Sequence, residues 1–256
     1  MLFSRETRRK LSALRRGTPE DAPEPRPLDT TVAPAPDPPN EPVPVEDLFS
    51  GEVVEGDFGL CYVMRRPVEM AREAALSQTL GVQPEADLAF LDIETLGLAS
   101  LPVFLVGVLR YRNGALSLTQ ILARDVPEEA QLLAETVAGL EGATALFTYN
   151  GASFDLPYLH ERAIYHGVDW WVEAKHVDLL KPARRRFRSC FPDCRLQTLE
   201  TRLCGRSRED DIPGAEIPRR YQDFVRTGDG RLLEVILRHN QLDLLTLAEL
   251  VPHCTE

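Results

Sequence analysis

Two acids interrupt an otherwise apolar stretch of the chain, FLDIETLGL at residues 90–98. The residues that lead into it, ADLAF, are mostly apolar, so the stretch is predicted to be a buried strand. Because residues i and i+2 of a strand point to the same face, Asp92 and Glu94 are predicted neighbours. An unpaired buried charge costs several kcal/mol or more. Any fold of this chain must therefore leave the pair solvated or supply a compensating partner.

Two further acids lie at the margins of apolar elements. Asp155, in YNGASFDLPYL, falls in the first turn of a predicted helix, where the helix dipole also favours an acid for structural reasons alone. Asp243, in ILRHNQLDLLTLAEL, has apolar neighbours at helical spacing, whereas an ordinary surface acid does not occupy such a face. These neighbours are Ile236, Leu247 and Leu250.

The four carboxylates come from three separate elements and indicate one shared partner. Mg²⁺ and Mn²⁺ take oxygen ligands and retain water, so Asp92, Glu94, Asp155 and Asp243 suit them. We expect two such ions, about 4 Å apart, to support phosphodiester hydrolysis. His239 lies four residues before Asp243 on the same helical face. It is expected to accept the proton of the attacking water or orient that water, with a purely structural role as the alternative.

The apolar pattern predicts an α/β domain with a mixed sheet flanked by helices. The predicted elements are a hairpin at 51–66, a helix at 67–80, strands at 87–94, 102–112 and 115–123, a helix at 127–140, a strand at 144–149, a helix at 153–166, a short strand within 175–180, and a final helix at 231–251. Asn113-Gly114 is a strong hairpin signal between two of the strands. This order is that of an RNase H-like domain.

Composition excludes some classes of protein and localises the charge. The longest apolar runs are far short of the roughly 20 residues that a membrane span needs. The five cysteines form no CxxC pair, which indicates a reducing compartment, so we expect the cytoplasm. The net charge is −11, yet nine Lys and Arg lie between Lys181 and Arg208 against two acids. Such a basic strip suits a phosphate backbone, with Phe187 and Phe191 available to stack on bases.

Short motifs resemble those of a known family. DIET (92–95), YNGASFD (149–155) and HNQLD (239–243) are similar to the three motifs of DEDD-type 3′–5′ exonucleases. The phrases HVDLLKPARRRFR, CRLQTLE, DDIPGAEIPRRY and RHNQLDLLTLAEL resemble the YprB-type RNase H-like family, from about Gly51 to the C-terminus. The resemblance implies that the four carboxylates bind two divalent metals and that the substrate is nucleic acid, single-stranded DNA or RNA.

The resemblance also bears on the other site residues. We expect the nucleic acid to contact Asn150, Lys181, Arg184, Arg185, Arg186 and Arg188. In the histidine branch of the exonucleases the histidine stands five residues before the last aspartate, and in the proofreading branch a tyrosine stands four before. This chain has His239 at the tyrosine spacing, and one residue rotates a helical position by about 100°. The resemblance therefore does not carry the general-base role over to His239.

Three units are expected along the chain. Ten of the twenty prolines lie between Pro19 and Pro44, so residues 1–47 are predicted to form a disordered basic and proline-rich tail, a possible site for a protein partner. Residues 48–86 are predicted to form a hairpin and helix that pack on the nuclease domain, residues 87–256. Two alternatives to an exonuclease stay open: a structure-specific endonuclease on the same site, and a non-cleaving nucleic-acid-binding or adaptor protein.

Overall fold

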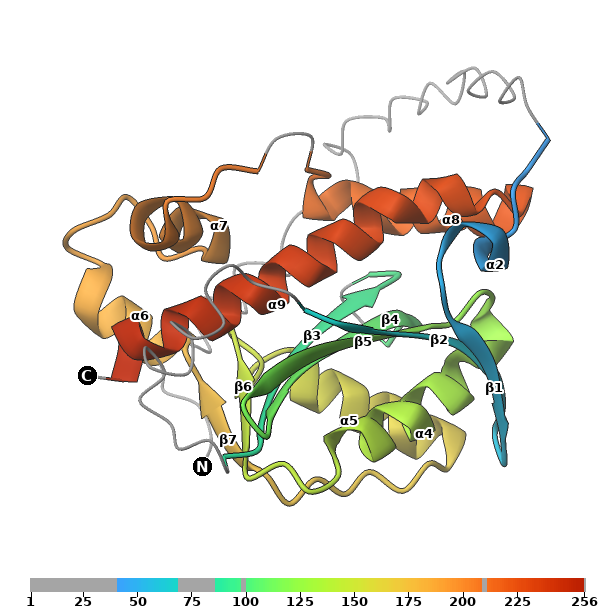
Figure 1. The fold of residues 1–256 in the computed structure, drawn as a ribbon, viewed down its shortest axis with the longest axis horizontal. Coiled ribbons are helices and arrows are strands. Elements are labelled where there is room, and N and C mark those ends of the chain that lie inside the picture. The colour runs from blue at the N-terminus through green and yellow to red at the C-terminus, as the bar shows by residue number, and fades with distance from the viewer. Residues whose placement is uncertain (1–40, 69–85, 98–99, 209–210, 256) are drawn as a thin grey trace, which may run out of the picture. The chain divides into compact units, whose positions relative to one another are not determined.

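The computed structural model describes residues 41–68, 86–97, 100–208 and 211–255. A seven-stranded sheet has the order β1-β2-β5-β4-β3-β6-β7 (Figure 1). Along this order, every neighbouring pair from β1 through β2, β5 and β4 to β3 is antiparallel. The pairs β3–β6 and β6–β7 are parallel. The strands are β1 (Glu52–Gly56), β2 (Gly59–Pro67), β3 (Leu88–Thr95), β4 (Val103–Arg112), β5 (Ala115–Leu122), β6 (Ala145–Thr148) and β7 (Lys175–Asp178). The predicted mixed sheet flanked by helices is confirmed.

Helices cover both faces of this sheet. In Figure 1, α4 and α5 lie on one face and the long α9 crosses the other. The helices are α2 (Val45–Leu48), α4 (Glu129–Leu140), α5 (Asp155–His166), α6 (Leu180–Phe187), α7 (Leu196–Leu199), α8 (Ile217–Thr227) and α9 (Glu234–Thr255). Short 3-10 turns are η2 (Val126–Glu128), η4 (Gly214–Glu216) and η5 (Gly230–Leu233), and η3 (Glu200–Cys204) is a π-helical turn.

Successive side chains of β3 point to opposite faces of the sheet and so enter two separate layers of the core. Leu88 and Phe90 pack with residues of α9, whereas Leu91 and Ile93 pack with residues of α4 and α5. A strand buried on both faces reads as a continuous apolar run, which explains the composition of residues 88–91. Because alternate residues share a face, the even-numbered positions of β3 point toward α9.

Most predicted elements are found, with ends shifted by a few residues. The hairpin turn between β4 and β5 has φ of 53° at Asn113 and 79° at Gly114, as a primed turn requires. The prediction that Pro67 begins a helix is wrong, because Pro67 is the last residue of β2 and pairs with Ser117. There β2 has run beyond β1, so the missing N–H of proline leaves no strand neighbour unpaired. The rest of that predicted helix, 69–80, lies outside the described residues.

The predicted tail also lies mostly outside the described residues, which begin at residue 41. Residues 41–47 carry structure of their own: Val45 is buried, and the Gly230 N–H donates a hydrogen bond of 2.8 Å to the Val43 carbonyl. Strands β1 and β2, from the predicted 48–86 unit, extend the same sheet as β3. The division of the chain into three units stays a prediction.

A buried ionic cluster joins α4 to α5 on the face opposite α9. The Glu129 carboxylate is fully buried and accepts hydrogen bonds from Arg162 (2.8 and 2.5 Å), from the Val103 N–H (2.8 Å) and from His166 Nε2 (2.8 Å). Burial raises the pKa of this carboxyl, but the Arg162, Val103 and His166 donors outweigh burial and lower the pKa below its ordinary value. The cluster ties both helices to the start of β4.

We expect Arg162→Leu to lower the free energy of unfolding by roughly 3–5 kcal/mol, because it leaves a buried carboxylate without its main partner. The matched control is Arg65→Leu, which breaks the half-exposed pair with Glu52 and should cost about 1 kcal/mol or less. Urea unfolding of the two variants measures the difference. Equal losses would show that Glu129 does not depend on Arg162.

Candidate active site

Asp92 and Glu94 lie near the end of β3 and point to the face that α9 covers. Both side chains are partly exposed. Burial raises the pKa of Asp92 well above its ordinary value, and the charges of Asp243, Glu94 and Asp155 raise it further. Burial likewise raises the pKa of Glu94, followed by the charges of Asp243, Asp155 and Asp211. The strand therefore holds two carboxylates where neither ionises easily on its own.

Asp155 reaches the same place from the other side of β3. It is the first residue of α5, directly after the turn that follows β6, and it is 6% exposed. The pKa of Asp155 is raised to about 7, chiefly by burial and also by the charges of Asp178 and Asp243, which together outweigh the backbone hydrogen bonds from Asp155 and Ile93 that lower it. The sequence predicts this position but not how firmly the turn is held.

Asp178, at the end of β7, holds that turn. Its carboxylate accepts hydrogen bonds from the backbone N–H groups of Asn150 (2.9 Å), Ala152 (3.1 Å) and Leu180 (2.9 Å). Asn150 has φ of 68°, a left-handed conformation that asparagine tolerates better than most residues. One carboxylate thus fixes both the loop before Asp155 and the start of α6. These contacts give Asp178 a structural role beside the candidate site.

Asp243 enters from α9, whose buried stripe surrounds it as predicted. The side chain is 17% exposed, and its Oδ1 lies 2.5 Å from Arg208 Nη2. Burial raises the pKa of Asp243, and the charges of His239 and Arg208 pull it down without cancelling that effect. The four predicted carboxylates are therefore brought together, because the charge of Asp243 on α9 raises the pKa of Asp92, Glu94 and Asp155.

Arg208 is a buried cation that the sequence does not reveal as such. It is 5% exposed and also contacts Glu200 Oε2 (2.5 Å) and Asp211 Oδ2 (3.2 Å). The sequence places it within the basic strip, but its guanidinium faces inward and pairs with acids. Arg206 behaves in the same way, with ion pairs to Glu200 (2.9 Å) and Glu249 (2.6 Å). Nothing in their spacing distinguishes them from surface arginines.

His239 lies between two carboxylates and is 7% exposed. Its Nδ1 lies 2.9 Å from Asp211 Oδ1, and its Nε2 lies 3.5 Å from Asp243 Oδ2. His239 and then Arg208 lower the pKa of Asp211 against the effect of burial, so Asp211 holds the ring as an ionised partner. Asp211 therefore orients His239.

The remaining predicted residues lie on or beside α6. Lys181, Arg184, Arg185 and Arg186 are exposed on that helix, and Arg188 is exposed just after it. The expectation that Phe187 stacks on bases is wrong, because its ring is buried in the core and Phe191 stacks on it at 5.6 Å. The role of Asn150 and of the exposed basic side chains in binding nucleic acid stays a prediction.

The donor set at this site suits hard divalent cations. It consists of carboxylate oxygens, and their shared burial and repulsion are what bound cations relieve. In the arrangement that the described residues adopt, no three His, Cys, Asp or Glu side chains form a ready-made metal cage. Both oxygens of Asp243 face cationic or ring nitrogen atoms here, so a bound metal would share that carboxylate with Arg208 and His239.

Comparison with known proteins places the chain in a family. The sequence profile of the RNase H superfamily matches residues 89–255, which is more than half of the chain, so the protein belongs to this superfamily. The chain is also 31% identical over 196 residues to the uncharacterized protein YprB of Bacillus subtilis (strain 168), which covers 74% of this chain and 47% of YprB. It thus spans about half the length of this relative. The YprB-type RNase H-like domain expected from the motifs is confirmed.

Solved structures align with this chain. The family B DNA polymerase from the archaeon Pyrobaculum calidifontis aligns with a TM-score of 0.54 and 18% identity, over 80% of this chain and 28% of the polymerase. A zinc-bound complex of Escherichia coli exonuclease I with single-stranded DNA aligns more weakly, with a TM-score of 0.37 and 16% identity, over 63% and 45% of the two chains. At these identities the likeness concerns the fold alone.

Among the described residues, no helix combines the length and the apolar character that crossing a membrane requires.

We expect Asp155→Asn to weaken the pH dependence of stability in the metal-free protein. The folded pKa of Asp155 is about 7 against an ordinary 3.8, so its protonated form stabilises the fold at low pH. That contribution is present in full below about pH 4 and is lost as the pH rises through 7. At pH 8 in EDTA the free energy of unfolding of the variant should exceed that of the wild type by about 1 kcal/mol or more, since one pKa unit corresponds to roughly 1.4 kcal/mol.

Urea unfolding between pH 5 and pH 8 measures this effect, with the exposed Asp223→Asn as the control. Parallel pH profiles for Asp155→Asn and the wild type would contradict the assigned pKa.

Proposed function

We propose that this protein is a metal-dependent nuclease that hydrolyses phosphodiester bonds of nucleic acid, acting as a 3′–5′ exonuclease on single-stranded DNA or RNA. One observation carries the proposal. Four carboxylates from β3, α5 and α9 converge where burial raises each pKa, and the charge of Asp243 raises the pKa of the other three further. Such a set is costly to the fold on its own, and hard divalent cations are the partner that offsets the cost.

The residues divide the work by position. Asp92, Glu94, Asp155 and Asp243 would hold two Mg²⁺ or Mn²⁺ ions, which supply Lewis-acid chemistry to the scissile phosphate and lower the pKa of an attacking water. Asp178 keeps the turn before Asp155 fixed through its three backbone contacts. Asp211 keeps the His239 ring beside Asp243. These contacts preorganise the donors before any substrate binds.

The basic side chains of α6 suit the phosphate backbone of the substrate. The first residue of this helix, Leu180, donates its N–H to the same Asp178 carboxylate that holds the Asn150 turn, so the start of α6 lies beside the loop that precedes Asp155. An acidic site repels nucleic acid unless nearby cations compensate, and the exposed Lys181, Arg184 and Arg185 supply such charge. The polarity 3′–5′ and the preference for single strands rest on the resemblance of the three motifs to DEDD exonucleases.

We expect Asp92→Asn and Asp243→Asn to abolish cleavage of a labelled single-stranded oligonucleotide, because each removes a metal ligand while keeping the size of the side chain. The control is Asp223→Asn, a half-exposed acid on α8 that lies outside the site. EDTA should inactivate the wild type and Mn²⁺ or Mg²⁺ should restore it. Retained activity in both site variants would refute the assignment.

The same assay separates the rival functions. A 3′-blocked oligonucleotide should resist a 3′–5′ exonuclease and should still be cut by an endonuclease on the same site. A protein that binds the oligonucleotide in the presence of Mn²⁺ but leaves it intact under all conditions would be a non-cleaving binding or adaptor protein.

We expect His239→Gln to lower the cleavage rate more than it lowers Mn²⁺ affinity, because the ring touches Asp243 without belonging to the oxygen donor set. Rates at saturating metal, together with calorimetric Mn²⁺ titration, measure the two effects. An unchanged rate would make the histidine structural.

A further inference from the structure

A row of three residues crosses the centre of the sheet beneath α9. In the strand register Asp92 of β3 faces Gly107 of β4, which in turn faces Gln120 of β5. Residues opposite one another on neighbouring strands share a face, so Asp92 and Gln120 flank the glycine on the α9 side. One candidate metal ligand thus stands two strands away from a buried amide.

The glycine leaves a space that Asn240 of α9 fills. A Cβ atom at position 107 would lie 2.2 Å from Asn240 Oδ1 and 2.6 Å from Leu244 Cδ1, closer than any such contact allows. Asn240 is fully buried, and Gln120 is 2% exposed. The Asn240 amide therefore sits directly over the backbone of β4, between the two polar residues of the row.

Hydrogen bonds run through these amides toward Asp92. Gln120 Nε2 donates to the Leu237 carbonyl (2.8 Å) and to Asn240 Oδ1 (3.0 Å). Asn240 Nδ2 then donates to Asp92 Oδ2 (2.8 Å) and more weakly to the Asp92 carbonyl (3.3 Å). Because a carbonyl only accepts, the contact with Leu237 fixes which end of the Gln120 amide faces Asn240, and this in turn directs the Asn240 N–H toward the carboxylate.

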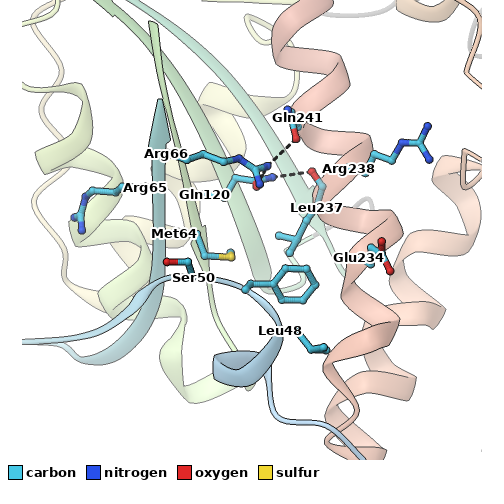
Figure 2. Close-up of a pocket in the computed structure, with 11 residues that line it drawn as sticks. Leu48, Ser50, Met64, Arg65, Arg66, Gln120, Glu234, Leu237, Arg238 and Gln241 are labelled. Carbon is cyan, nitrogen blue, oxygen red and sulfur yellow. Dashed lines mark hydrogen bonds between the residues drawn. The ribbon is translucent and has the colours of Figure 1, made fainter. Parts of the chain in front are cut away.

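The far end of the chain of hydrogen bonds meets a cation. Arg66 Nη2 donates to Gln120 Oε1 (3.2 Å) and to Gln241 Oε1 (2.7 Å), and Figure 2 shows Arg66 and Gln120 reaching α9 from the sheet. They line a cavity of about 390 Å³ whose wall also includes Met64 and Leu237. Arginine donates and never accepts, so every bond from Arg66 to Asp92 points in the same direction.

We propose that Asn240 and Gln120 are positioning residues that fix the Asp92 carboxylate for metal binding, an inference that rests on the proposed nuclease function. The Asn240 N–H engages Oδ2 of Asp92 and so sets the rotation of the carboxylate. A leucine at position 240 suits the core better than a buried amide does, since polar burial costs free energy that the amide offsets only with partners. The amide is therefore explained by what it holds.

The experiment is calorimetric Mn²⁺ titration of the full chain at fixed pH, with thermal unfolding in EDTA beside it. We expect Asn240→Leu to weaken Mn²⁺ binding about 10-fold or more, as the loss of a hydrogen-bonding partner of a metal ligand typically does. Gln120→Met should weaken it less, and the double variant should lose no more than Asn240→Leu alone, because both act through one path. Gln241→Met is the control, since it removes an acceptor of Arg66 that lies off this path.

Gly107→Ala provides a steric test that leaves every polar group in place. It should displace the Asn240 amide and weaken Mn²⁺ binding. If Asn240→Leu does not unfold cooperatively, the Mn²⁺ affinities of Gly107→Ala and Gln120→Met test the inference in its place. A purely structural role would lower the melting temperature of the variants and leave Mn²⁺ affinity unchanged, and that result would overturn the inference. Absence of Mn²⁺ binding in the wild type would instead refute the proposed function, and the inference would fall with it.

Discussion

Repulsion among buried carboxylates is the constraint around which this structure is arranged. Asp92 and Glu94 share a face of β3, and Asp155 and Asp243 approach them from α5 and α9, so that burial and like charge raise the pKa of each group. A fold maintains such a group only if other interactions oppose the repulsion. Here Arg208 and His239 hold Asp243, Asn240 holds Asp92, and Asp178 holds the turn that precedes Asp155.

The buried charges on the two faces of the sheet have different roles. On the α4 and α5 face, the fully buried Glu129 carboxylate is paired with Arg162 and contacts His166 Nε2, and these contacts join two helices. On the α9 face, the acids outnumber the cations that contact them, and the excess of negative charge gathers at the end of β3. The first arrangement stabilises the fold, whereas the second suits the cations that we propose to bind there. This contrast is the physical basis for placing the proposed active site beneath α9.

The sequence predicts what depends on local periodicity. The pleat of a strand places Asp92 and Glu94 together, and the 3.6-residue repeat of a helix places His239 beside Asp243 on an apolar stripe, and the structure shows both. Asn240 lies three residues before Asp243 on that same stripe, so its polarity was a signal that sequence reasoning could have used. What sequence reasoning missed depends on register and on distant contacts. Gln120 meets Asn240 across 120 residues, and Arg208 meets Asp243 across 35, so neither partner is visible in a local pattern.

Similar reasons explain the errors. Arg206, Arg208 and Phe187 belong to a segment whose composition suits a nucleic-acid surface, yet tertiary packing turns two arginines inward to acids and the phenylalanine into the core. A run of charged or aromatic residues in the sequence describes composition alone. The fold determines which of these side chains face solvent. The remaining exposed cations lie on α6. The first residue of that helix donates its backbone N–H to Asp178, which also holds the turn before Asp155.

Anomalous diffraction from crystals soaked in Mn²⁺ tests the central claim most directly. The account predicts two peaks about 4 Å apart, bounded by Asp92, Glu94, Asp155 and Asp243. Crystals that bind no Mn²⁺ at these carboxylates, or bind it only elsewhere, would contradict it.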